Sequence, residues 1–482
     1  MNEQVLLEKV RKGEEMPLNS QIQLVLSLAF PAILAQLTSV VMQYIDAAMV
    51  GQLGTYKSAA IGLMSTTLWL TGGVLSALAI GFQVQVAHKI GAEEDREARR
   101  IMKHGFITGL LFSGLILLLG LLIYRHLPYW LGGTEDIARD ASRYLFVYIV
   151  ALPILMTEFL SSGMLQSSGM VKLSSVISIV ICGLDVLFNY ILIFPTRTVT
   201  FFGYRFQMYG ANLDVVGASL GTMCAETVGT LAMLYIIYKR VDKLKYRASD
   251  RLISGGSYVK HLKKAIKIAY PVAIEEIILG SAQVMITRIV SPLGAVALSA
   301  NSFAITAESF CYMPGFGISV AGTTLVGQSV GANRKRLAGR FGCLVVGLGI
   351  LVMAGTGILL YALAPWMMQI LTPVKEVQQL GVACLRIEAL AEPLFGAAIV
   401  AGGVFRGTGN TLKPSLVNLC TMWLIRIPIA AFLAVRIGLK GVWIAMCIDL
   451  MMRGAIFLVM LWKWNQNQKK LEVESKTKSD GN

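Results

Sequence analysis

Carboxylates and amides stand at helical spacing inside the long apolar segments of this 482-residue chain. Asp46 lies near the end of the segment 22–48, and a charge at membrane depth costs about 3 kcal/mol on insertion scales. Gln36 and Gln43 share a face with Asp46, because residues separated by three, seven and ten positions line one side of a helix. This polar stripe predicts a face that lines an ion site or a watery cavity instead of lipid.

A second carboxylate stands in another apolar segment, 173–194, where Asp185 is followed one turn later by Asn189. Two carboxylates held close together in a poorly hydrated pocket cannot both stay charged without a counter-ion. Asp46 and Asp185 therefore predict a site that takes up a proton or binds Na⁺ between oxygen ligands, with Asn189 in support. The alternative is that these polar side chains only join helices through hydrogen bonds.

Other polar side chains within the apolar segments predict a substrate cavity. The stripe of Gln36 and Gln43 is repeated 240 residues later by Glu276 and Gln283. We assign six side chains to the cavity: Gln36, Gln43, Glu276, Gln283, Glu308 and Glu392. The sequence assigns no role to four further charged residues: Glu158, Glu226, Glu388 and Arg426. Asp449 and Arg453 are one turn apart and predict a structural ion pair.

Membrane-spanning helices must position these residues. The chain is 55% hydrophobic and 15% charged with a mean hydropathy of +0.65, whereas soluble proteins carry about 25% charged residues. Apolar segments of roughly 20 residues are long enough to cross a bilayer as helices. The sequence predicts twelve of them, at 22–48, 58–85, 102–124, 141–161, 173–194, 215–238, 264–289, 296–325, 340–364, 378–402, 413–434 and 440–463. The expected fold is an all-α polytopic membrane protein.

The distribution of basic residues predicts the orientation of the chain. Lys and Arg concentrate in the segments that lie inside if both termini are cytoplasmic, as the positive-inside rule requires. This asymmetry accounts for the net charge of +15 without a nucleic-acid partner. The densest basic stretch, 239–267, predicts a cytoplasmic linker with an amphipathic part on anionic lipid. The seven cysteines and four histidines show no metal-binding or catalytic spacing, so we expect no enzyme and no cofactor.

The two halves of the chain repeat each other at a constant offset of 240 residues. Pro31 matches Pro271, and further matches continue to Gly169 and Gly409. The insertion 195–214 has no counterpart and predicts a short outside hairpin. Two six-helix halves of equal orientation predict a parallel repeat with a cavity between two lobes. The expected divisions are a first lobe at 1–238, a linker at 239–263, a second lobe at 264–463 and a polar tail at 464–482.

Several motifs resemble those of the multidrug and toxic compound extrusion (MATE) family, and its DNA-damage-inducible-like bacterial branch in particular. They are Pro31, Asp46, Gly51 and Gly54 in the first segment, "VGQSVGANRKRLAGR" at 326–340, "GVFRGTGNTLKP" at 403–414 and its echo "GMLQSSGMVKLS" at 163–174. The resemblance covers residues 22–463. It places this chain in the polysaccharide-flippase superfamily and adds Thr222 to the ion-coupling set of Asp46, Asp185 and Asn189. The sequence departs from the usual pattern of the family at two places. Leu279 stands where family members often carry a glutamate, and Asp185 and Asn189 occur in the reverse of the usual order.

The resemblance implies a secondary active multidrug efflux transporter that exchanges Na⁺ or H⁺ for organic compounds. We expect small amphipathic, often cationic substrates, a monomer, and a multi-pass location in the plasma membrane with contacts to lipid. The alternative is a lipid-linked oligosaccharide flippase of the same superfamily. Flippases often carry cavity arginines for pyrophosphate, whereas the cavity residues here are mostly acidic.

Overall fold

The computed structural model describes residues 3–12, 14–201, 204–245 and 255–479. Its first half contains six long helices, and a short helix, α1 (Glu3–Lys12), precedes them. The six are α2 (Leu18–Gly51), α3 (Thr55–Gly91), α4 (Asp95–Ile123), α6 (Glu135–Ser167), α7 (Val171–Ile193) and α8 (Asp214–Lys239). The one-turn helix α5 (Leu127–Trp130) joins α4 to α6.

The second half contains six helical paths, two of them interrupted. The continuous ones are α9 (Gly255–Val290), α10 (Ala295–Gly331), α11 (Lys335–Leu371) and α16 (Leu439–Ser479). The fourth path is broken into α12 (Lys375–Glu388) and α13 (Glu392–Thr408), and the fifth runs from α14 (Leu412–Thr421) through the π-helical turn η3 (Met422–Arg426) to α15 (Ile427–Ile437). A 3₁₀ turn, η2 (Ser291–Leu293), joins α9 to α10.

These helices confirm the predicted membrane architecture. Within the described residues, 10 helices are long and apolar enough to cross a membrane, and the pair α12–α13, bent by 61°, makes an eleventh span. The one remaining path is α9, the first of the second half, whose 36 residues include Glu275, Glu276 and several lysines.

Two segments differ in extent from their predicted ranges. α9 begins at Gly255, so the part of the predicted linker at 255–263 is helical, and residues 246–254 of that linker lie outside the described residues. α16 continues to Ser479, so most of the predicted polar tail is a helical extension of the last span. The insertion at 195–214 forms the predicted hairpin, with β1 (Pro195–Phe201) antiparallel to β2 (Tyr204–Ala211).

The backbone reproduces the sequence repeat. α3 and α10 each contain 37 residues and begin after glycines with φ of 103° and 97°. Positive φ angles recur at the same offset of 240 residues, where the chain turns between helices. They fall at Gly54 and Gly294, at Glu93 and Asn333, and at Gly169 and Gly409. The two halves therefore share their turn geometry as well as their helix order.

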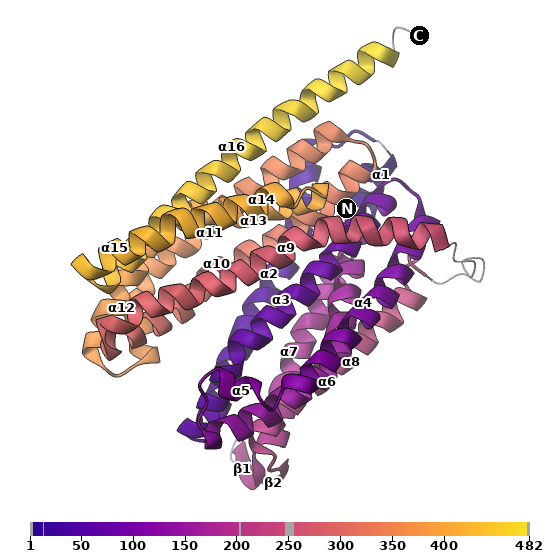
Figure 1. The fold of residues 1–482 in the computed structure, drawn as a ribbon. Helices are drawn as coiled ribbons and strands as arrows, with labels where there is room; N and C mark the ends of the chain where they lie inside the picture. Colours follow the sequence, from indigo (N-terminus) through magenta and orange to yellow (C-terminus); the bar gives the residue numbers. More distant parts are fainter. Residues whose placement is uncertain (1–2, 13, 202–203, 246–254, 480–482) are drawn as a thin grey trace.

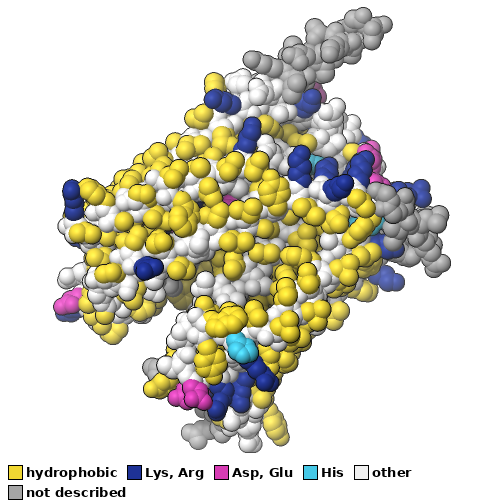
Figure 2. All heavy atoms as spheres, in the orientation of Figure 1, with side chains coloured by type: hydrophobic (Ala, Val, Ile, Leu, Met, Phe, Trp, Pro, Cys, Tyr) yellow, Lys and Arg dark blue, Asp and Glu magenta, His cyan; other side chains and the backbone are white. Residues whose placement is uncertain are grey.

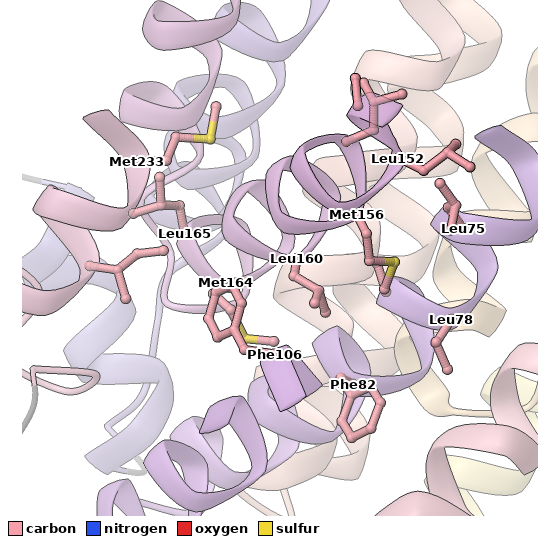
Figure 3. Close-up of a cluster of buried hydrophobic side chains, with 14 of the residues drawn as sticks. Leu75, Leu78, Phe82, Phe106, Leu152, Met156, Leu160, Met164, Leu165 and Met233 are labelled. Atoms are coloured by element: carbon pink, nitrogen blue, oxygen red, sulfur yellow. The ribbon is translucent and has the colours of Figure 1, made fainter. Parts of the chain in front are cut away.

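The two groups of helices diverge at one end of the molecule and meet at the other. Figure 1 shows α12 and the β1–β2 hairpin separated at the diverging end, with α1 at the opposite end. Figure 2 shows a notch between the lobes at the diverging end, and a largely apolar outer surface around both lobes. The first lobe has its own apolar core, in which Phe82, Phe106, Met156 and Leu160 pack between α3, α4 and α6 (Figure 3).

Close helix contacts seal the converging end. A Cβ on Gly91 would collide with the carbonyl group of Gln328, and a Cβ on Gly331 would collide with that of His88. These two contacts are related by the repeat. Arg11 of α1 adds a link, because it donates to the Gln328 side chain at 3.2 Å and to the Ser168 carbonyl at 3.2 Å. The structure is therefore closed between the lobes at the end where α1 lies.

Candidate ion-coupling and substrate sites

The structure brings together the two carboxylates that the sequence pairs. Asn189 of α7 donates from Nδ2 to Asp46 Oδ1 of α2 at 3.0 Å and to Asp185 Oδ2 at 3.2 Å. Asp185 and Asn189 are each 1% exposed, whereas Asp46 is half-buried. One amide thus bridges two carboxylates from different helices. This arrangement leaves the Asp46 carboxylate as the more accessible of the pair.

α8 closes the other side of this site. Gly221 approaches Asn189 so closely that a Cβ there would collide with Asn189 Oδ1. Thr222 lies beside Asp185, and its hydroxyl donates to the Ala218 carbonyl at 3.2 Å. Among the described residues, Asp185 Oδ1 and Asn189 Oδ1 are buried and have no hydrogen-bond partner. The site therefore holds two unsatisfied oxygen acceptors.

Two glutamates without an assigned role extend the acidic region of the first lobe. Glu226 of α8 stands one turn after Thr222 and interacts electrostatically with Asp185. Glu158 of α6 in turn faces Glu226. Both glutamates are half-buried. Acidic side chains from α2, α6, α7 and α8 thus follow one another through this lobe.

The predicted cavity residues separate into two groups in the structure. Gln43 and Gln283 are exposed, Gln36 is half-buried, and half-buried Glu276 packs against Gly73 of α3. Their part in substrate binding stays a prediction. In contrast, Glu308 is 6% exposed and Glu392 is 0% exposed. These two belong to the interior of the second lobe and do not line an open cavity in this conformation, because α10 and α13 pack closely at their positions.

The sequence did not predict the contacts that Glu275 makes. Glu275 ranks below Glu276 by its place on the helix, yet it accepts hydrogen bonds from Ser415 Oγ and Asn418 Nδ2 of α14, each at 2.5 Å. The pairing depends on how α14 packs against α9, which no local sequence pattern encodes. The predicted ion pair of Asp449 and Arg453 is confirmed, at 2.6 Å.

No conventional metal centre accompanies these sites. Across the described ranges, no group of three or more His, Cys, Asp or Glu side chains converges as a metal site. The Asp46–Asn189–Asp185 constellation offers carboxylate and amide oxygens, which are the ligands that hard cations prefer.

Both halves of the chain match one family model. The model, described as MatE, matches residues 31–191 and 271–432. The chain belongs to the MatE family. Members of this family are membrane transporters and not enzymes, which agrees with the twelve helical paths and two lobes of this MatE protein.

Individual relatives are distant but cover nearly the whole chain. A probable multidrug resistance protein NorM of Thermotoga maritima is 26% identical over 453 residues, covering 92% of each chain. The uncharacterized transporter YisQ of Bacillus subtilis is 23% identical over 449 residues, covering 91% of this chain and 93% of YisQ.

Solved structures share the fold of this MatE protein. A MATE crystal structure in complex with MaL6 has a TM-score of 0.86 at 18% identity, covering 96% of this chain and 99% of that one. An outward-facing multidrug resistance MATE transporter has a TM-score of 0.85 at 18% identity, covering 93% and 97%.

Proposed function

We propose that this MatE-family protein is a secondary active multidrug efflux transporter that exchanges Na⁺ or H⁺ for organic compounds. The observation that carries the proposal is the triad in which Asn189 bridges Asp46 and Asp185. A two-lobed fold closed at one end supports the proposal, because carriers that work by alternating access share this plan. The multidrug resistance names of relatives along the full length support the substrate class over the flippase alternative.

The triad would respond to a cation by rearranging its hydrogen bonds. The Asn189 amide donates to both carboxylates from Nδ2, while its Oδ1 is buried with no hydrogen-bond partner among the described residues. A bound Na⁺ would need that oxygen, so the Asn189 side chain would rotate and turn its carbonyl group toward Asp46. A proton would instead sit on one carboxyl group and leave the amide in place. Either cation removes the repulsion between the two carboxylates.

α2 provides a route from this site to the other lobe. Pro31 lies inside α2, where its missing N–H and its ring weaken the helix. Just beyond it, the backbone of Ala32 and Ile33 meets Gly317 of α10 so closely that a Cβ on Gly317 would not fit. A change at Asp46 that bends α2 at Pro31 would therefore displace α10, and with it the contact between the lobes.

The expected setting is a monomer in the plasma membrane, with both termini in the cytoplasm. The basic residues that concentrate in the predicted inside segments support this orientation. It places the closed end at the cytoplasm and the notch outside. Substrates that fit are small amphipathic cations, for which half-buried Glu276 near the lobe junction provides an opposite charge.

The function is tested by ethidium efflux from proteoliposomes in which Na⁺ and pH gradients are imposed separately. We expect efflux well above that of protein-free vesicles under at least one gradient. Movement of the same compound at the same rate with no gradient would contradict active exchange. Selective movement of lipid-linked sugars, with no ethidium transport, would favour the flippase alternative.

The orientation predicts which positions an impermeant maleimide labels on intact cells. The background must be cysteine-free, because Cys224, Cys343 and Cys420 are exposed. A cysteine replacing Tyr209, which is 84% exposed on β2, should be labelled. A cysteine replacing exposed Lys245 should be labelled only after permeabilisation. The reverse pattern would contradict the proposed orientation.

A further inference from the structure

Two of the four histidines meet where the start of α9 packs against the first lobe. His104 of α4 and His261 of α9 are 2% and 5% exposed, and their Nδ1 atoms lie 3.0 Å apart. The Nε2 atom of His261 lies 2.9 Å from Glu97 Oε1 of α4. Beside the rings, the hydroxyl groups of Thr108 and Tyr258 share a hydrogen bond at 3.0 Å. Three polar contacts thus join α4 to α9, and the central one connects two buried imidazoles.

α9 is the helix through which the chain passes from the first lobe to the second. Its early turns lie on the first lobe, where a Cβ on Gly81 of α3 would collide with the Ala265 carbonyl. Farther along, Glu275 accepts hydrogen bonds from α14 of the second lobe. Pro271 lies between these two parts and weakens the helix there. The contacts around His261 therefore help to decide how firmly α9 is held to the first lobe.

The contact between the two rings limits how many protons they can hold. A neutral imidazole has one N–H donor and one acceptor nitrogen, whereas a charged imidazolium has two donors. Across the contact of 3.0 Å, one Nδ1 must donate and the other must accept. At least one of the two rings must therefore be neutral. A proton on both rings would bring two N–H groups head to head and two positive charges side by side.

The surrounding charges do not compensate a second positive ring. Among the described residues, Glu97 is the carboxylate that faces both rings, and it is already shared with Arg100 at 3.2 Å. Tyr258 places its ring at 85° to that of His104, with 5.1 Å between the centroids. The other charged groups that face the rings are basic: Arg100 and Lys103 beside His104, and Lys89 and Lys260 beside His261. A doubly charged pair would therefore meet four basic groups and one carboxylate.

From this geometry we propose that His104 and His261 form a pH-sensitive contact that holds the start of α9 on the first lobe and releases it when both rings are protonated. Histidine changes its charge between about pH 5 and 8, so the contact holds at neutral pH and weakens on acidification. A metal ion does not fit between the rings, because Glu97 binds the far nitrogen of His261 and no three His, Cys, Asp or Glu groups converge within the described ranges.

The effect of this contact on transport rests on the proposed function, whereas its sensitivity to pH does not. His104 lies on the third turn of α4, near the end of the molecule where the lobes converge. In the proposed orientation this end faces the cytoplasm, so the imidazole pair would respond to cytoplasmic pH and not to the pH outside. Acidification of the cytoplasm would free the start of α9 to move about Pro271.

Hydrogen–deuterium exchange of the purified full-length protein in lipid tests the contact through the backbone amides of residues 259–265, corrected for the intrinsic effect of pH. In the wild type, protection of these amides should fall about tenfold between about pH 7.5 and about pH 5.5. His104→Gln leaves one imidazole, which cannot form a doubly charged pair, so its protection should be nearly the same at both pH values. His126→Gln, at an exposed position, should behave like the wild type.

Nitrogen-15 spectra of the histidine rings give a second measurement on the wild type itself. At neutral pH, one Nδ1 of the pair should carry a proton and the other should not, and protection should be lost as the second ring becomes charged. Full protection with both rings charged, or constant protection over the whole pH range, would overturn the proposal. An equal fall of protection in His104→Gln would also overturn it. If His104→Gln is unprotected at both pH values, the wild-type spectra decide.

The outcome is distinguishable from that of the proposed function. Protection that falls with pH, in a protein that shows no gradient-driven ethidium efflux, would uphold the imidazole pair and refute the proposed function. Protection that is independent of pH, in a protein with gradient-driven efflux, would do the opposite.

Discussion

Asp46→Asn is expected to reduce gradient-driven ethidium efflux to the level of protein-free vesicles while the protein stays folded. The substitution keeps the shape of the side chain and an oxygen that accepts from Asn189, but it removes a charge from the pair. Without two opposed carboxylates, the site no longer needs a cation, so binding of Na⁺ or H⁺ loses its driving force. Asp185→Asn should have the same effect, because Asp185 is 1% exposed and is bridged to Asp46 through the same amide.

Two further variants distinguish a loss of cation coupling from general damage to the fold. Asp136→Asn, at an exposed position in the first turn of α6, should transport at the wild-type rate. The double exchange Asp185→Asn with Asn189→Asp should recover part of the activity of Asp185→Asn. It restores two carboxylates, because position 189 already lies within hydrogen-bond distance of Asp46. Efflux by Asp46→Asn at the wild-type rate under both Na⁺ and pH gradients would refute this role of the pair.

Gly221→Ala is expected to impair efflux nearly as strongly as Asp46→Asn does, although it changes no charge and no hydrogen-bonding group. The added methyl group would collide with Asn189 Oδ1 and lie 2.8 Å from the Asn189 backbone nitrogen. α8 must then move away or the Asn189 side chain must rotate, and either response separates the amide from one carboxylate. Overpacking of this kind costs about 1–3 kcal/mol, so a moderate loss of thermal stability should accompany the loss of transport.

A matched glycine in α7 serves as the control for that substitution. A Cβ at Gly183 meets nothing within 4 Å, so Gly183→Ala should leave the efflux rate unchanged. Initial efflux rates at equal protein density and melting temperatures in detergent measure both effects. Equal rates for Gly221→Ala and Gly183→Ala would show that the close approach of α8 to Asn189 is irrelevant to transport.

The architecture follows from the sequence because membrane helices obey a strong length and hydropathy rule. The apolar segments and the 240-residue offset predict twelve helices in two equivalent halves, and the turns at Gly54 and Gly294 repeat that offset in their backbone angles. The unmatched insertion at 195–214 likewise predicts a hairpin. The start of α9 was less predictable, because its first turns carry the polar sequence of a linker, whereas the structure packs this helix against α3 and α4.

The site was partly predictable. Carboxylates inside two apolar segments predict that Asp46 and Asp185 share a site, and the structure places Asn189 between them. The burial of Glu308 and Glu392 could not be read from helical spacing. Their surroundings depend on the break between α12 and α13 and on the π-helical turn before Arg426, both of which rotate side chains away from a regular helical face.

The role of the Asp46–Asn189–Asp185 triad is tested most directly by cation binding to the purified protein, measured as ²²Na⁺ binding and as proton release on addition of ethidium. The wild type should show at least one of these signals, Asp46→Asn and Asp185→Asn should lose it, and Asp136→Asn should retain it. Wild-type cation binding in both Asp46→Asn and Asp185→Asn would contradict the assignment of the triad as the coupling site.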